Sequence, residues 1–169
     1  MRPGTLLFQT FTTNDKDEAI SKSGGSGLMI NHVGIFAGGG KVISAMPDSG
    51  VVEVSRRAFE SGATIQVVRN IRNEYIVPAA IARARSFVGR PYNATFLPNQ
   101  PGLYCSELVT ESFLLPCGRR YFALHKLRFD DEKFWRKYYQ RLGMEMPFDA
   151  MGSHPAQLLA QDLFENPGR

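Results

Sequence analysis

The chain has 169 residues, of which 43% are hydrophobic and 21% are charged, and its formal net charge is +4. These values are ordinary for a single soluble globular domain over residues 1–169, with enough chain to bury a hydrophobic core. No apolar run has the length of a membrane-spanning helix, which excludes an integral membrane segment, and the mild charge favours a solvated helix face over a nucleic-acid partner.

The first residues bear on the compartment. Residues 1–5 lead directly into a strand-like segment and contain no hydrophobic region of the kind that signal peptides carry. The chain as written is therefore expected in the cytoplasm, whereas removal of a leader would place it in the periplasm or cell envelope. The residues indicate no particular oligomeric state.

Strands are predicted in the first part of the chain. Apolar, β-rich runs bounded by glycine and polar residues predict strands over residues 5–11, 32–37, 41–45, 51–54 and 63–69. The three glycines of residues 38–40 separate two of these runs, which indicates a β-hairpin. Residues 12–27 are polar and rich in glycine and serine, and they predict a surface loop with a helical turn over residues 15–20.

Helices are predicted in the second part of the chain, over residues 78–88, 105–115, 130–142 and 155–164. Pro78 occupies a tolerated position in the first turn of its helix, and Gly89 follows the end of the same helix. Strands that precede helices predict an α+β fold, in which an antiparallel sheet is packed against helices.

Cys105 stands where a loop rich in proline and glycine, residues 98–102, meets the first turn of a predicted helix. Unpaired backbone N–H groups and the positive end of the helix dipole favour a thiolate there, which predicts a partly exposed nucleophile with a lowered pKa. Cys117 lies twelve residues later, on the order of 18 Å along a helix, so no disulfide is expected. Cys117 is interpreted as a core residue at the helix end.

A thiol nucleophile needs a base and a group that orients the base. His32 begins a predicted strand and is the candidate base. Ser44, on the neighbouring strand of the hairpin, is the best-placed polar residue to hold its ring, with Glu53 as an alternative. The backbone N–H of Cys105 is a candidate oxyanion donor. Taken alone, these residues slightly favour a structural alternative, in which Cys105 is buried and inert and His32 bonds a backbone carbonyl.

Other residues have simpler interpretations. Tyr104 and Gln9 are candidate substrate contacts, with a solvent-facing side chain as the alternative for Gln9. Tyr92 is predicted to pack beneath the site, and His125 and His154 are predicted to be structural or surface residues. No cluster of cysteine and histidine has the spacing of zinc ligands, so neither a metal site nor a cofactor is predicted.

Five segments, taken in order, resemble one family. They are residues 5–9 (TLLFQ), 31–35 (NHVGI), 41–45 (KVISA), 89–93 (GRPYN) and 103–109 (LYCSELV). Together they are similar to the YiiX/YebB-like group, which consists of circularly permuted, bacterial members of the NlpC-type papain-like cysteine hydrolases. The resemblance runs over residues 4–115, and the order of histidine before cysteine is that of a permuted papain-like fold.

The resemblance implies a circularly permuted papain-like fold in which Cys105 is the nucleophile and His32 the base. The family usually carries a glutamate followed by alanine on the second hairpin strand, where this chain has Ser44 and Ala45. The implied activity is that of a cysteine peptidase or amidase that forms a thioester acyl-enzyme on a small peptide or amidated amino acid. Two alternatives remain open: a catalytically degenerate binding module, favoured by Ser44, and a lipid acyltransferase or thioesterase.

Overall fold

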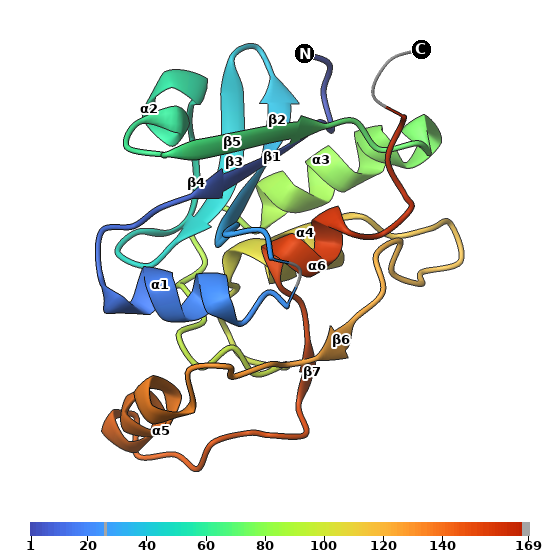
Figure 1. Ribbon diagram of the computed structural model, residues 1–169. Coiled ribbons are helices and arrows are strands. Elements are labelled where there is room, and N and C mark those ends of the chain that lie inside the picture. Colours follow the sequence, from blue (N-terminus) through green and yellow to red (C-terminus); the bar gives the residue numbers. More distant parts are fainter. Residues whose placement is uncertain (26, 167–169) are drawn as a thin grey trace.

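A computed structural model describes residues 1–25 and 27–166. Five antiparallel strands form one sheet in the order β4-β3-β2-β1-β5 (Figure 1). The strands are β1 (Leu6–Thr10), β2 (His32–Gly38), β3 (Lys41–Met46), β4 (Gly50–Ser55) and β5 (Ile65–Arg69). The predicted α+β fold with an antiparallel sheet is confirmed, and each predicted strand is found within two residues of its expected ends.

The helices depart more from the prediction. They are α1 (Asp15–Lys22), α2 (Arg56–Glu60), α3 (Val77–Ser86), α4 (Cys105–Ser112), α5 (Glu132–Arg141) and α6 (Pro155–Leu159), with a 3-10 turn η1 (Glu74–Ile76). A second small sheet pairs β6 (His125–Lys126) with β7 (Met151–Gly152). The short elements α2, η1, β6 and β7 were not expected from the sequence, and α4 and α6 end earlier than predicted.

The main core lies between one face of the sheet and helices α3, α4 and α6 (Figure 1). Leu6, Phe8 and Ile35 project from the sheet into this core, and Leu108 and Val109 meet them from α4. Alternate residues of a strand face opposite sides, so this set includes every second residue of β1. Through this core, helix α4 packs against β2 and β3.

The opposite face of the sheet is covered by α2. Phe59 of this helix packs on Leu7, Phe36 and Val42. Gly34 makes this close approach feasible, because a Cβ atom there would lie 2.6 Å from a carbon of the Phe59 ring. The side chain of Phe59 is therefore seated directly over the start of β2.

Helices α1 and α5 form a third packed unit below the sheet in Figure 1. Ala19 of α1 packs with Trp135 and Tyr139 of α5. The indole Nε1 of Trp135 donates a hydrogen bond to the hydroxyl of Ser23 at 3.1 Å, which joins α5 to the end of α1. No helix within the described ranges has the length and apolar character that crossing a bilayer requires.

The end of α4 corrects one interpretation. The helix stops at Ser112 because Phe113 leaves helical geometry, with a ψ of 88°. Cys117 therefore lies beyond the helix and is exposed, so its interpretation as a core residue was wrong. The expectation that both cysteines are free thiols is confirmed.

Candidate active site

His32 is the first residue of β2 and pairs with Gln9 of β1. Its side chain is buried, with 7% of the residue exposed, and it contacts two aromatic rings. The ring centroids of Phe11 and Phe59 are 5.6 Å and 5.5 Å from that of the imidazole. The packing of α2 on the sheet thus fixes one side of the ring.

Ser44 meets the imidazole from the neighbouring strand. Its Oγ lies 2.8 Å from Nε2 of His32, and its hydroxyl donates weakly to the sulfur of Met46 at 3.8 Å. The tautomer of the ring sets the direction of this contact. In the tautomer with the proton on Nε2, the serine oxygen accepts from Nε2–H and Nδ1 is the proton-accepting nitrogen.

Cys105 is the first residue of α4 and is 6% exposed. Its sulfur lies 4.0 Å from the carbonyl oxygen of Asn31, and the backbone N–H of Val33 donates to it. These two residues flank His32, so the sulfur is held against the main chain on both sides of the candidate base. The described side-chain hydrogen bonds do not include one between the thiol and the imidazole.

The predicted low pKa and partial exposure of Cys105 are wrong. Burial raises the pKa of the thiol to about 11, although backbone N–H groups of Val33, Ser106 and Cys105 itself act in the opposite direction. The free energy needed to remove a thiolate from water is larger than the stabilisation that these hydrogen-bond donors give to it. The helix terminus alone, which the sequence argument used, does not decide the pKa of the thiol.

Burial also shifts the pKa of the candidate base, His32. It lowers the pKa of His32 to about 4, with the carboxylate of Asp17 opposing the shift. A thiol pKa of about 11 and an imidazole pKa of about 4 mean that both groups are neutral at pH 7. The resting site therefore holds a neutral thiol and an uncharged ring, not a thiolate–imidazolium pair.

A cavity of about 260 Å³ brings the two groups to one surface. Cys105 and His32 both line it, together with the charged residues Lys16, Asp17 and Asp48. The cavity extends from the thiol toward α1 and the turn after β3. A polar or charged group of a bound molecule can therefore pair with these charged side chains in the same cavity that Cys105 and His32 line.

Asn31 is a structural residue of the site that sequence reasoning missed. Its side chain accepts from the backbone N–H of Phe11 at 2.9 Å and donates to the carbonyl of Asp17 at 3.1 Å. A further donation reaches the hydroxyl of Ser21 at 3.1 Å. The residue before His32 thus ties the start of β2 to α1. Its position directly before the candidate base, at the start of a predicted strand, was the available signal.

Two predicted substrate contacts are placed differently. Tyr104 is buried at the start of α4, and its hydroxyl oxygen accepts from the backbone N–H of Ser153 at 3.1 Å. Gln9 is fully buried, not solvent-facing, and its amide nitrogen donates to the carbonyl of Phe59 at 3.1 Å. Gln9 does not line the 260 Å³ cavity, so its role as a substrate contact stays a prediction without support from its position.

The remaining candidates have other surroundings. Glu53 lies opposite Ile43, not Ser44, in the sheet and pairs with Arg85, with 3.1 Å between the charged atoms. Tyr92 lines the 260 Å³ cavity. His154 is buried and structural, since Nε2 donates to a backbone carbonyl and Nδ1 accepts from the N–H of Ala156. His125 lies in β6, where its Nε2 contacts Gln161 at 3.2 Å.

Glu107 is a titratable group in α4 that the sequence argument did not single out. Its carboxylate accepts from the side-chain amide of Asn93 at 3.0 Å and from the backbone N–H of Tyr104 at 3.3 Å. Burial raises the pKa of Glu107 to about 7, and the two hydrogen bonds oppose this shift. The residue thus links the start of α4 to the loop that follows Tyr92.

The raised pKa predicts a pH-dependent stability. Between pH 5 and pH 8 the unfolded carboxyl is ionised, whereas Glu107 in the fold keeps its proton until about pH 7. The contribution of Glu107 to the free energy of unfolding should therefore decrease as pH rises through this window, whereas the lowered pKa values of His32 and His154 act in the opposite direction, so the contribution of Glu107 is read from the difference between wild type and variant. A Glu107→Gln variant keeps an acceptor oxygen without the charge, so it should exceed the wild type by about 1 to 3 kcal/mol at pH 8 and match it near pH 5. Urea denaturation at the two pH values measures the difference.

The matched control is Asp162→Asn, which changes a carboxylate whose side chain is 91% exposed. It should leave the difference between pH 5 and pH 8 as in the wild type. Parallel pH profiles for the wild type and Glu107→Gln would contradict the burial argument.

Comparison with known proteins places these observations in context. A family model described as "Permuted papain-like amidase enzyme, YaeF/YiiX, C92 family" matches residues 1–167. A solved structure, described as that of metalloprotein yiiX from Escherichia coli O157:H7, is similar with a TM-score of 0.80 and 18% identity, covering 97% of this chain and 94% of that one. A search of curated proteins finds no significant match. The predicted resemblance and the permuted papain-like fold are confirmed.

That structural relative is described as a metalloprotein. Within residues 1–25 and 27–166 of this chain, no group of three or more histidine, cysteine, aspartate or glutamate side chains is arranged to hold one metal ion. The donor set of the described residues therefore does not fit a protein-bound metal.

Proposed function

Because the chain belongs to the YaeF/YiiX family of permuted papain-like amidases, we propose that it hydrolyses an amide or ester of a small peptide or amidated amino acid. In this proposal Cys105 is the nucleophile, His32 the general base and acid, and Ser44 the positioning residue. One observation carries the assignment: the sulfur contacts the main chain on both sides of His32, and both side chains line one cavity.

Acylation begins with the neutral pair. Nδ1 of His32 takes the thiol proton as the sulfur of Cys105 bonds to the substrate carbonyl carbon, and the carbonyl π electrons move to oxygen. The backbone N–H of Cys105 is the candidate donor to that oxyanion. When the oxyanion collapses, the C–N bond breaks, the amine leaves with the proton from His32, and a thioester remains on Cys105.

Deacylation repeats the sequence with water. His32 takes a proton from the water that attacks the thioester carbonyl, and it returns this proton to the sulfur as the C–S bond breaks. The acid product leaves and the thiol is restored. Ser44 accepts from Nε2–H of His32 throughout, which holds the ring with Nδ1 available for transfer.

Because the pKa of the Cys105 thiol is about 11, little thiolate is present to begin the reaction. At pH 7 only about 10⁻⁴ of such a thiol is ionised at equilibrium. Attack is therefore coupled to proton transfer to His32, as in serine hydrolases, and does not draw on a standing thiolate. The neutral base is available because its pKa is about 4.

A catalytically degenerate binding module is the second candidate. Ser44 favours it, because a serine hydroxyl bears no charge with which to stabilise an imidazolium. The raised pKa of Cys105 points in the same direction. Such a protein would bind an amide or ester in the cavity of about 260 Å³ without cleaving it.

Trapping the acyl-enzyme separates these functions. The protein is mixed with panels of dipeptide amides and 4-nitrophenyl esters, quenched in acid, digested and analysed by mass spectrometry. We expect turnover and an acyl adduct on the peptide that contains Cys105. Binding without turnover, retained by Cys105→Ala, would establish the binding module instead, and an adduct only on the exposed Cys117 would contradict the assignment of the nucleophile.

A further inference from the structure

A charged cavity of about 340 Å³ lies between helices α1 and α5. Its α1 side carries Asp15 and Glu18, and its α5 side carries Lys133, Lys137 and Arg141. We call this cavity the α1–α5 groove. None of its lining residues belongs to the cavity of about 260 Å³ that holds the candidate catalytic pair. The groove is therefore a separate surface, and an inference about it does not rest on the proposed function.

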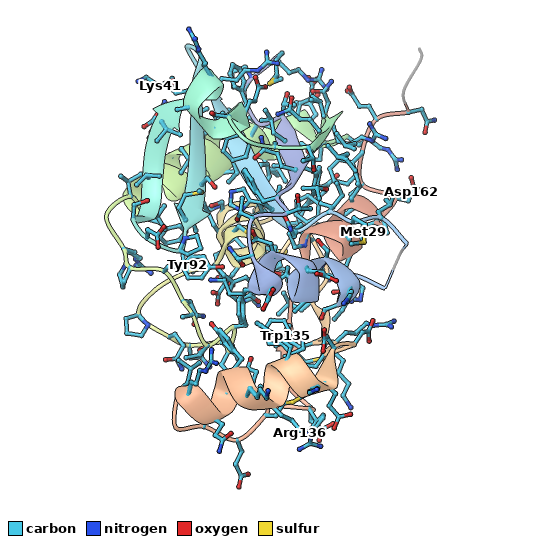
Figure 2. All side chains as sticks on the ribbon, turned by 60° about the vertical axis from the view of Figure 1, so that its left-hand side comes forward. Met29, Lys41, Tyr92, Trp135, Arg136 and Asp162 are labelled. Atoms are coloured by element: carbon cyan, nitrogen blue, oxygen red, sulfur yellow. The ribbon has the colours of Figure 1, made fainter. Side chains whose placement is uncertain are left out.

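Lys133, Lys137 and Arg141 form one exposed stripe along α5. They lie four residues apart, and because an α-helix rises 1.5 Å per residue, neighbouring members of the stripe are about 6 Å apart and the whole stripe spans about 12 Å. Figure 2 shows Trp135 on the side of α5 that faces α1 and Arg136 on the opposite side. Since Trp135 packs α5 onto α1, the stripe has a fixed position beside the groove.

The positive charge of the stripe is not compensated within the fold. Among the described residues, none of its three cations has an ion-pair or hydrogen-bond partner. By contrast, Lys22 at the end of the groove pairs with Glu18 at 2.8 Å, and Arg136 elsewhere on α5 pairs with Glu132. Like charges four residues apart on a helix repel one another. An anionic occupant of the groove would relieve this repulsion.

The facing side of the groove carries the opposite charge. Asp15 begins α1, and its carboxylate also has no hydrogen-bond or ion-pair partner in the described ranges. A ligand that is negative on every side, such as a nucleic acid or an anionic membrane surface, would be repelled by Asp15 and Glu18. A ligand with acidic groups on one side and a basic group on the other pairs with both sides of the groove.

An extended peptide has this alternation. Its successive side chains point to opposite sides, and side chains two residues apart lie on the same side at about 6.6 Å. This distance matches the spacing of about 6 Å along the stripe on α5. One water-sized group needs about 10 to 15 Å³, so about 340 Å³ holds roughly 20 to 35 heavy atoms, or about three to four amino-acid residues.

We propose that the α1–α5 groove binds an extended peptide segment of a partner protein, with acidic residues at alternate positions and a basic residue between them. The acidic side chains pair with Lys133, Lys137 and Arg141, and the basic side chain pairs with Asp15.

Two peptides of equal composition test the groove. One is Glu-Lys-Glu-Gly-Glu and the other Glu-Glu-Glu-Lys-Gly, both with blocked ends and an uncharged fluorophore, titrated with the full chain by fluorescence anisotropy at low salt. We expect the alternating peptide to bind at least fivefold more tightly than its isomer. The affinity should decrease as salt is raised to about 0.15 M, because exposed ion pairs are screened.

Two variants test the two sides of the groove. Lys133→Gln combined with Lys137→Gln should weaken binding of the alternating peptide roughly four- to 25-fold, since one exposed ion pair contributes roughly two- to fivefold. Asp15→Asn should weaken binding of this peptide roughly two- to fivefold and should not affect an analogue with glycine in place of its lysine.

Lys41→Gln combined with Arg57→Gln is the matched control, because it removes the same charge from exposed positions outside the groove. Figure 2 shows Lys41 at the end of the molecule opposite α5. The Kd of this double variant should stay within twofold of the wild type. Cys105→Ala should also bind the alternating peptide as the wild type does, so the result does not depend on whether the protein is an amidase.

Several outcomes would overturn the inference. Equal affinity for the two isomers, or equal losses in the two double variants, would show that charge alone drives binding. Phosphatidylglycerol vesicles or tripolyphosphate bound more tightly than the alternating peptide, and released by the changes at Lys133 and Lys137, would assign the groove to a lipid headgroup or a phosphate instead. Absence of peptide binding at millimolar concentration would also overturn it.

Discussion

A Cys105→Ala variant should lose amide hydrolysis by at least about 10⁴-fold in kcat, because Cys105 provides the one thiol among the described residues that line the cavity. Substrate affinity should change little, since alanine preserves the backbone N–H of this position and the apolar walls beside it. Steady-state kinetics give kcat, and calorimetry with an uncleaved substrate gives Kd.

Cys117→Ala is the control for this experiment and should retain full activity. Cys117 is exposed, and a hydrogen bond from Arg119 lowers the pKa of its thiol, whereas burial raises that of Cys105. Alkylating reagents should therefore modify Cys117 first, so thiol labelling has to be mapped to the peptide. Residual activity of Cys105→Ala within tenfold of the wild type would show that the nucleophile lies elsewhere.

A His32→Gln variant should lose about 10²- to 10⁴-fold in kcat/KM, the usual contribution of a general base. Glutamine is polar and similar in size, and it cannot accept and return the thiol proton. In the wild type, kcat/KM should hold as pH falls from 7 and decline only near pH 4, because burial lowers the pKa of His32 to about 4 and the ring must be neutral to act. Initial rates between pH 3.5 and pH 8 measure this profile.

His125→Gln serves as the control, since His125 lies in β6 and does not line the cavity that contains Cys105 and His32. Its pH profile should match that of the wild type. An acid limb at pH 6.5 in the wild type would contradict the burial of the base, and a His32→Gln variant within threefold of the wild type would remove His32 from the mechanism.

The hairpin that carries His32 and Ser44 could be predicted because its signals are local. Glycines separate two apolar runs, and strand alternation indicates which residues share a face. The 2.8 Å contact between Ser44 and His32 agrees with that geometry. The order of histidine before cysteine carried the family resemblance, which the match over residues 1–167 confirms.

The electrostatic state of Cys105 could not be predicted in the same way. Its position at a helix start is local, but its burial depends on Asn31, on β2 and on loops distant in the sequence. Helix α2 was missed because it has only five residues, too few for periodicity to show, although Ser55 caps it by accepting from Ala58. The contribution of Trp135 to a wall near the thiol likewise follows from tertiary packing alone.

The two phenyl rings near His32 matter because, among the described residues, no carboxylate is hydrogen-bonded to its ring. Phe11 and Phe59 have centroids within 6 Å of the imidazole centroid, the range in which the negative face of an aromatic quadrupole attracts a cation. In the proposed mechanism the ring becomes cationic when it accepts the thiol proton. The two aromatic rings and the carboxylate of Asp17 are then the groups placed to offset part of that transient charge.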